Sequence, residues 1–175
     1  QIKNLGDDPL YVLIDAPEFV STLTAAYAEY TRDLVLRSTA SENSFGVMTI
    51  RSPKASVDVP VFHIGLSNFE CDLTIVDIAG LSIGKDATID YILTRETTEE
   101  LADVDLTATL LSREGDILAK RITSLTFSGT EYSNELSFSI PSELEEGTYG
   151  LILTLSQGEK TSTAYRAVEL TRSSP

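Results

Sequence analysis

The chain contains no tryptophan, and its 175 residues include one cysteine, one histidine and one methionine. Because Cys71 is the only cysteine, no intrachain disulfide can form to stabilise the fold. We expect Cys71 to be a small buried side chain. Single copies of His63, Cys71 and Met48 cannot repeat a ligand pair at helix or turn spacing, which argues against a zinc or copper centre. We expect His63 to be an ordinary strand residue and the protein to use no cofactor.

Long apolar runs and a basic surface are absent as well. No stretch approaches the 18 apolar residues that a membrane-spanning helix needs. The formal charge is −14. Five basic and nine acidic residues before position 71 leave −4, and eight basic and eighteen acidic residues after it leave −10. Such a surface repels nucleic acid and anionic lipid, so we expect neither nucleic acid nor direct membrane contact, and its simplest role is solubility.

The sequence is rich in Ser, Thr and β-branched or apolar residues, which favour half-buried strands. From residue 71 onward, apolar residues alternate with polar ones in seven segments separated by turn residues. These segments are 72–79, 88–95, 104–110, 117–127, 135–140, 148–156 and 162–170. Alternation puts one face of each strand in a core, and seven short strands at this spacing predict a β-sandwich.

The connection before the sixth of these strands has an informative spacing. It places Glu145, Gly147 and Tyr149 two residues apart, between two segments with period-two alternation. This spacing resembles the tyrosine corner of immunoglobulin-like sandwiches, in which a tyrosine at the start of a strand bonds back to the backbone. The resemblance implies that Tyr149 is buried and that its hydroxyl donates to the backbone near residues 144–146.

Residues 71–171 as a whole resemble the immunoglobulin-like repeats of prokaryotic secreted and cell-surface proteins, macroglobulin-type modules included. The chain departs from antibody-type domains because it has no tryptophan, and Leu151 stands where those domains have their second cysteine. The resemblance implies an all-β, immunoglobulin-like β-sandwich for 71–175. It implies little about activity, because one fold serves many functions.

The first 70 residues predict a second β-rich unit, with strands at 11–14, 45–51 and 57–66, so that two β units stand in tandem and join near 67–71. The stretch 17–31 supports two interpretations. Apolar residues recur there at three- and four-residue spacing after Pro17 and Glu18, as in an amphipathic helix. The Thr-rich composition instead favours strands at 22–30 and 34–37. The sequence leaves both open.

Calcium is the one metal with candidate ligands. Asp103 and Asp105 lie two residues apart at the start of a strand, so their carboxylates would share a face. Calcium needs six to eight oxygens, which acidic loops at the end of a sandwich can supply. No Asp-x-Asp-x-Asp-Gly loop is present, and a solvated acidic rim is the simpler interpretation. We therefore expect no metal, with Asp103 and Asp105 as the weak candidates.

These observations favour a non-catalytic structural or protein-binding module of a secreted or cell-surface prokaryotic protein. The start at Gln1 is compatible with an upstream signal or anchor that has been removed. The alternative is a carbohydrate-binding or accessory domain of a larger extracellular enzyme. We expect a protein partner, or self-association, through strand edges. The apolar segment 45–50, which carries no charge before Arg51, is either covered within the chain or such an edge.

Overall fold

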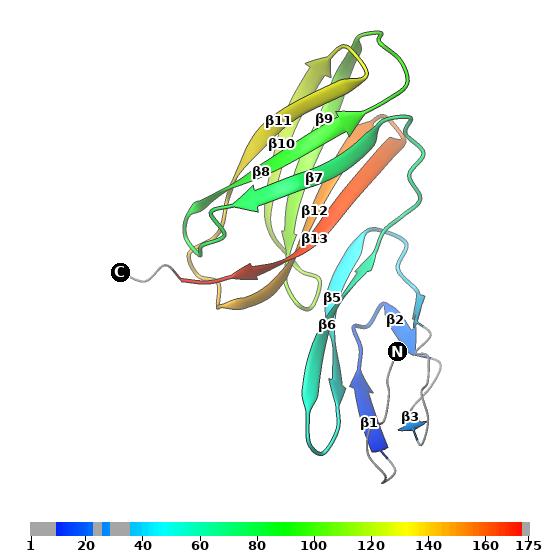
Figure 1. Ribbon diagram of the computed structural model, residues 1–175, viewed down its shortest axis with the longest axis vertical. Helices are drawn as coiled ribbons and strands as arrows, with labels where there is room; N and C mark the ends of the chain where they lie inside the picture. Colours follow the sequence, from blue (N-terminus) through cyan, green and yellow to red (C-terminus); the bar gives the residue numbers. More distant parts are fainter. Residues whose placement is uncertain (1–9, 23–25, 29–35, 173–175) are drawn as a thin grey trace. The chain divides into compact units, whose positions relative to one another are not determined.

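The computed structural model describes residues 10–22, 26–28 and 36–172 (Figure 1). The chain divides into two compact units, Gln1–His63 and Ile64–Pro175. Every regular element in the described ranges is a β-strand, and all the paired strands are antiparallel, so the all-β prediction is confirmed at that level. Within these ranges no helix is long and apolar enough to span a membrane.

The described residues of the first unit form one four-stranded sheet and one small two-stranded sheet. The larger sheet has the order β3-β1-β5-β6. Its strands are β1 (Leu10–Asp15), β3 (Ala26–Ala28), β5 (Ser44–Arg51) and β6 (Ser56–His63). The small sheet pairs β2 (Val20–Thr22) with β4 (Leu36–Ser38). Pro60 lies on the edge strand β6, where a missing N–H costs no ladder bond.

The helical interpretation of 17–31 is wrong for the residues that the structure describes. Val20–Thr22 and Ala26–Ala28 are strands, and positions 23–25 and 29–31 lie outside the described residues. Pro17 begins a turn and is not the first residue of a helix. The N–H of Val20 donates to the Pro17 carbonyl at 2.8 Å and closes this turn. The Pro17 ring packs on Gly46, where a β-carbon would come within 2.4 Å of the proline Cγ.

The segment 45–50 is a partly covered strand. β5 lies between β1 and β6 and pairs with β6 along its whole length, but it pairs with β1 only at residues 49–51. Phe45 is fully buried, and its ring packs on Phe62 with centroids 4.7 Å apart. These contacts cover the side chain of Phe45 and the backbone of residues 49–50 within the chain, and the use of residues 45–48 as a partner edge stays a prediction.

The second unit consists of two antiparallel sheets with the strand orders β11-β8-β7 and β10-β9-β12-β13 (Figure 1). The three-stranded sheet contains β7 (Asp72–Ala79), β8 (Asp86–Thr94) and β11 (Glu131–Ser139). The four-stranded sheet contains β9 (Leu101–Leu111), β10 (Ile117–Phe127), β12 (Gly147–Gln157) and β13 (Lys160–Leu170). All seven segments predicted from the alternation are strands.

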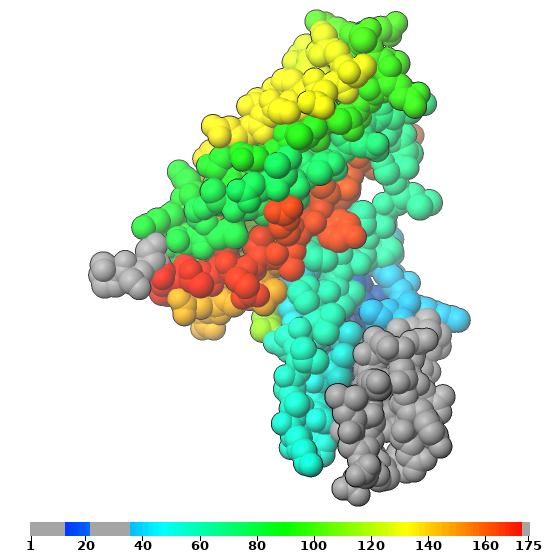
Figure 2. Space-filling view, in the orientation of Figure 1, coloured from blue at the N-terminus to red at the C-terminus, as the bar shows by residue number. Residues whose placement is uncertain are grey.

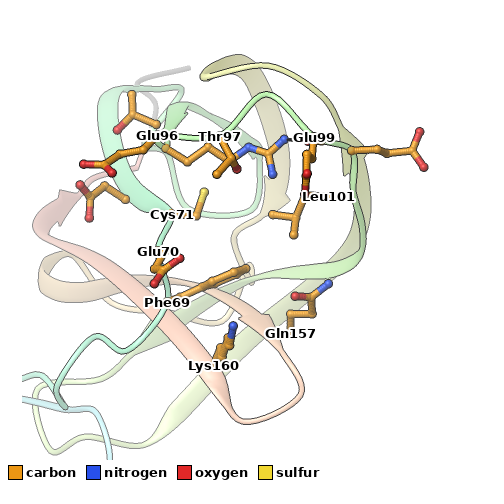
Figure 3. Close-up of a pocket in the computed structure, with 13 residues that line it drawn as sticks. Phe69, Glu70, Cys71, Glu96, Thr97, Glu99, Leu101, Gln157 and Lys160 are labelled. Atoms are coloured by element: carbon orange, nitrogen blue, oxygen red, sulfur yellow. Dashed lines mark hydrogen bonds between the residues drawn. The ribbon is translucent and has the colours of Figure 1, made fainter.

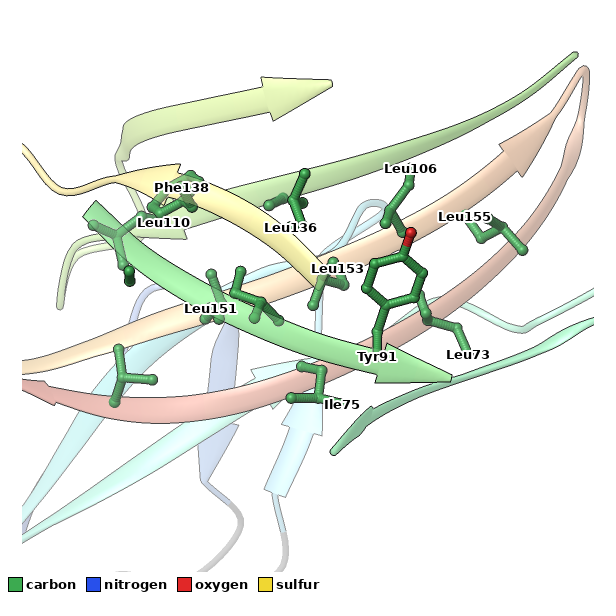
Figure 4. Close-up of a cluster of buried hydrophobic side chains, with 14 of the residues drawn as sticks. Leu73, Ile75, Tyr91, Leu106, Leu110, Leu136, Phe138, Leu151, Leu153 and Leu155 are labelled. Atoms are coloured by element: carbon green, nitrogen blue, oxygen red, sulfur yellow. The ribbon is translucent and has the colours of Figure 1, made fainter. Parts of the chain in front are cut away.

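Both sheets of this unit contribute alternate side chains to one core. Ile89 and Leu93 from β8 are fully buried, as are Leu106 from β9 and Leu153 and Leu155 from β12. Figure 4 shows the labelled side chains of this core converging in the space between strands. Burying one Leu or Ile contributes about 1.5–3 kcal/mol, so this core is the main stabilising feature of the unit.

The corner before β12 has the geometry that the sequence predicts. Tyr149 is 8% exposed, and its hydroxyl donates to the Glu145 carbonyl at 2.7 Å. Gly147 sits at φ 150°, a conformation that residues with a β-carbon rarely adopt. Arg172, which follows β13, stabilises the same corner. One of its guanidinium nitrogens donates to the Leu144 carbonyl at 2.9 Å.

We predict that Tyr149→Phe destabilises the second unit by about 0.5–1.5 kcal/mol, because it leaves the Glu145 carbonyl without its hydroxyl donor. Thermal unfolding followed by circular dichroism would measure the change, with an unchanged far-UV spectrum before the transition. Ser133→Ala, which removes the hydroxyl of an exposed serine on β11, is the control. Equal melting temperatures for the wild type and Tyr149→Phe would contradict a structural role for this hydrogen bond.

Candidate functional site

A cleft of about 590 Å³ opens at one end of the second unit. Three segments build it: the entry segment 69–72, the connection 94–101 between β8 and β9, and the turn between β12 and β13. Figure 3 shows Glu70 and Cys71 from the first segment, Glu96 and Thr97 from the second, and Gln157 and Lys160 from the third around the opening. These connections are far apart in the sequence, and the strand pairing brings them together.

Asn68 anchors the entry segment to the turn between β12 and β13. Its backbone N–H donates to the Thr161 carbonyl at 3.1 Å, and its side-chain oxygen accepts from the Thr161 N–H at 2.7 Å. Its side-chain nitrogen donates to the Glu159 carbonyl at 3.2 Å. The hydrogen bonds of Asn68 therefore resemble those between two paired strands. They fix the position of the entry segment where it becomes the wall of the cleft.

Arg95 stabilises the opposite wall. Its guanidinium donates to the Gly129 carbonyl at 3.0 Å and also to the Glu99 carbonyl. The guanidinium carbon lies 5.0 Å from the centre of the Phe127 ring, and that ring stacks on Tyr132 with centroids 5.0 Å apart. The hydrogen bonds and the cation–π contact fix the position of the connection after β8. The Arg95 guanidinium therefore has a structural role.

Cys71 lies at the bottom of the cleft and is 1% exposed. Burial raises the pKa of its thiol, Arg95 opposes that shift in part, and the nearby Asp72 carboxylate adds to it. The thiol is therefore protonated at neutral pH and is a poor nucleophile. Its burial agrees with the small core side chain expected from the sequence.

Carboxylates dominate the lining of this cleft. Five acidic side chains face two basic ones among the lining residues: Glu70, Asp72, Glu96, Glu99 and Glu100, against Arg95 and Lys160. Five acidic and two basic side chains give the lining of the cleft a formal charge of −3. The sequence alone does not predict that these acids surround a cleft, because the meeting of 69–72, 94–101 and 157–160 depends on strand order.

Asp103 and Asp105 are not among the residues that line this cleft, and each has a role of its own. Asp103 sits in a β-bulge, where Leu125 pairs with Val104 but Phe127 pairs with Leu101, and its φ of 56° is left-handed. Aspartate tolerates that conformation better than most residues. The Asp105 carboxylate accepts a hydrogen bond from Ser124 at 2.6 Å. Within the described ranges, no group of three or more His, Cys, Asp or Glu could hold a metal.

The sequence also contains a Gly-x-Ser-x-Gly motif that the predictions above do not include. Residues 80–84 read Gly-Leu-Ser-Ile-Gly, the spacing of a hydrolase nucleophile elbow, in which the serine lies between a strand and a helix. Here the segment connects β7 to β8, two strands. The backbone of Ser82 pairs with Thr171, and Ile83 is buried in the core. The glycines meet the needs of this loop, since Gly80 and Gly84 both have positive φ.

Comparisons with known proteins assign no family. No family model matches this chain, and no curated protein matches it. Among solved structures, it is similar to part of a family 123 glycoside hydrolase from Clostridium perfringens, an enzyme of glycolipid glycan hydrolysis. The identity is 12%, the TM-score is 0.42, and the match covers 58% of this chain and 27% of that chain. This chain thus matches about a quarter of that enzyme, at a similarity too low to support an inference about function.

We predict that the conformation of Asp103, rather than metal binding, determines its effect on stability. Asp103→Gly should keep or raise the melting temperature. Asp103→Val should lower the free energy of unfolding by about 1–2 kcal/mol, because a branched β-carbon is unfavourable at positive φ. Addition of EDTA or calcium should leave the wild-type melting temperature unchanged. A calcium-dependent rise in the wild type that Asp103→Gly removes would contradict this prediction and identify a calcium ligand.

We predict that Cys71 reacts slowly with iodoacetamide in the folded protein and at the rate of a free cysteine after unfolding. The pKa is raised in the folded state, so folding favours the protonated thiol. The resulting contribution to stability is complete at neutral pH and is lost as the pH rises through the raised pKa. Mass spectrometry of alkylation between pH 7 and 10 would measure this. Fast labelling of the native protein at pH 7 would contradict the assignment of Cys71 as a buried, protonated thiol.

Proposed function

We propose that this chain is a non-catalytic protein-binding module of a secreted or cell-surface prokaryotic protein, and that its second unit is an immunoglobulin-like sandwich. Two features support the fold assignment. The strand order β11-β8-β7 beside β10-β9-β12-β13 corresponds to the two-sheet arrangement of such domains. The hydrogen bond from Tyr149 to Glu145 lies just before the sixth strand of the unit, which is where these domains have their tyrosine corner.

The observation that carries a binding role is the cleft at the loop end. Connections placed by a rigid scaffold are where binding residues concentrate, and this cleft has acidic side chains around its opening. The Cys71 thiol and the Arg95 guanidinium of this cleft have structural roles. Cys71 is buried and protonated, and Arg95 donates hydrogen bonds to the backbone. The exposed connections and the edges of the sheets are therefore the working surfaces of the module.

Site-specific photo-crosslinking tests the proposal in the organism that carries the gene. A photoreactive residue replaces the exposed Thr97 on the cleft rim, and the matched control replaces the exposed Glu114 in the turn between β9 and β10. We expect a discrete protein adduct from position 97 in the full-length protein and none from position 114. Equal, diffuse labelling from both positions would argue against a binding role for the loop end.

Two further measurements separate the alternatives. Protease treatment of intact cells should remove the module, because we propose that it is exposed at the cell surface or secreted. A protected, cytosolic protein would contradict that location. On a glycan array we expect no binding. Saturable binding of a defined glycan, abolished by a change at the cleft rim, would instead favour the carbohydrate-binding or accessory domain of a larger extracellular enzyme.

A further inference from the structure

Within residues 64–172, the two sheets end in four edge strands, and three of these are protected against pairing with another chain. β10 carries Lys120 and Arg121, and its register with β9 shifts twice. β7 has a register shift after Ile75. β13 carries Lys160 and Arg166, and Arg166 donates to the Ile75 carbonyl of β7 at 3.1 Å. Charges, bulges and covering contacts are the devices that keep edge strands from pairing with other strands.

The fourth edge, β11, differs from these three within the described residues, because its only charged side chains are the acids Glu131 and Glu135 and no bulge interrupts it. It contains no Lys, Arg or Pro, and it pairs with β8 over nine residues without a register shift. Figure 1 shows it as the yellow strand along the outer border of its sheet, and Figure 2 shows its yellow atoms on the surface. A long, regular edge is a template for a further strand.

Local side-chain contacts identify which backbone groups face this open edge. The N–H of Glu135 donates to its neighbour's side-chain oxygen, Asn134 Oδ1, at 2.9 Å, and Asn134 in turn donates to the Tyr132 hydroxyl at 2.7 Å. This N–H therefore points away from β8. Because ladder bonds alternate along an antiparallel strand, the backbone groups of Ser133 and Ser137 face the same edge. The Asn134 side chain covers one donor that a docking strand would take over.

Charge is segregated between the two sheets, and this determines the chemistry of a partner. The strands β7, β8 and β11 contain six acidic residues and no basic one: Asp72, Asp77, Asp86, Asp90, Glu131 and Glu135. The strands β9, β10, β12 and β13 contain three acidic and four basic residues. An acidic surface of general solubility would not require this separation, and the acid lies on the sheet that has the open edge.

The carboxylates of this sheet also lie beside one another. In the register of the sheet, Asp90 is directly opposite both Asp77 and Glu135, so three acids form one row across the three strands. A groove of about 440 Å³ at this row includes Asp90, Glu135 and the half-exposed Val76 in its lining. Like charges directly opposite one another are unfavourable, and a cationic partner would relieve that repulsion.

The same charges disfavour a second copy of this chain at the edge. Antiparallel pairing of two β11 strands centred on Glu135 would put the two Glu135 side chains directly opposite each other, with like charge on like charge. A strand with lysine or arginine at alternate positions would instead place cations beside Glu131 and Glu135. The edge is therefore selective: it is open to a basic strand and unfavourable for itself.

We propose that β11 is the docking edge of this module and that its partner is an extended, basic protein segment that adds as a fourth strand to the sheet β11-β8-β7. This inference rests on the proposal that the chain is a protein-binding module and specifies one surface and the partner chemistry. Backbone hydrogen bonds to Ser133, Glu135 and Ser137 supply the pairing, and the acidic row supplies selectivity for basic side chains.

The experiment uses the full 175-residue chain and a labelled nine-residue peptide in which lysine and valine alternate. We expect saturable binding in fluorescence anisotropy that weakens with added salt, and new hydrogen-exchange protection at the amides of Ser133, Glu135 and Ser137. Two matched peptides are the controls. Alternating glutamate and valine should not bind, and N-methylation of alternate backbone nitrogens on the edge-facing side should abolish binding while keeping every charge.

Protein variants separate the edge from general electrostatics. Glu135→Lys should weaken binding about five- to tenfold at low salt, whereas Glu114→Lys, with the same change in net charge, should leave binding nearly unchanged. Ser137→Pro removes an edge N–H that is not in the ladder and leaves every charge in place, so it should fold and weaken binding by about three- to tenfold. If Ser137→Pro does not fold, the N-methylated peptide makes the same test on the unaltered protein.

The outcomes are distinct. Equal binding of the N-methylated peptide, equal effects of Glu135→Lys and Glu114→Lys, or protection that appears around the cleft instead of 133–137 would each overturn the docking edge. None of these results would remove a crosslinked partner found at position 97, so the edge can fail while the proposed function stands. Peptide binding at the edge without any crosslink at position 97 would support the edge and leave the loop end without a partner.

Discussion

The second unit depends on the burial of one core between its two sheets. Leu106, Leu153 and Leu155 are fully buried there, and the neighbouring strands contribute alternate side chains to the same cluster. Because each strand is fixed by the face it buries, a shift of one residue would expose its apolar side chains and bury its polar ones. The core therefore determines the register of every strand, and the register determines which connections meet at the cleft and which edge stays open.

Much of this fold could be predicted from the sequence, since period-two alternation reports directly on which face of a strand is buried. The ranges predicted for 72–79 and 117–127 are the observed bounds of β7 and β10. The corner was equally readable, because Gly147 and Tyr149 are needed at fixed positions for the turn and the hydrogen bond. Local chemistry specifies these features, so a single sequence contains them.

The first unit was harder to predict for a physical reason. Short strands carry little periodicity, and β2, β3 and β4 have three residues each, too few for alternation to exceed the three- and four-residue spacing that suggests a helix. The contact between Pro17 and Gly46 decides against the helix start, but it joins residues 29 positions apart. Strand order has the same difficulty, so the sequence could not place the acids of 96–100 around a cleft or identify which strand would be an edge.

Acidic composition has two interpretations that only the strand arrangement can separate. Charge that serves solubility needs to be on the surface, and its distribution among sheets is unimportant. Among the strands of the second unit, basic residues occur only on the four-stranded sheet, where Lys120, Arg121 and Arg166 lie on edge strands and Arg166 donates to the Ile75 carbonyl of β7. The strands of the three-stranded sheet, which ends at the edge β11, contain six acidic residues and no basic one. The docking edge that we propose depends on this separation, since acids beside β11 would favour a basic strand and oppose a second copy of the chain.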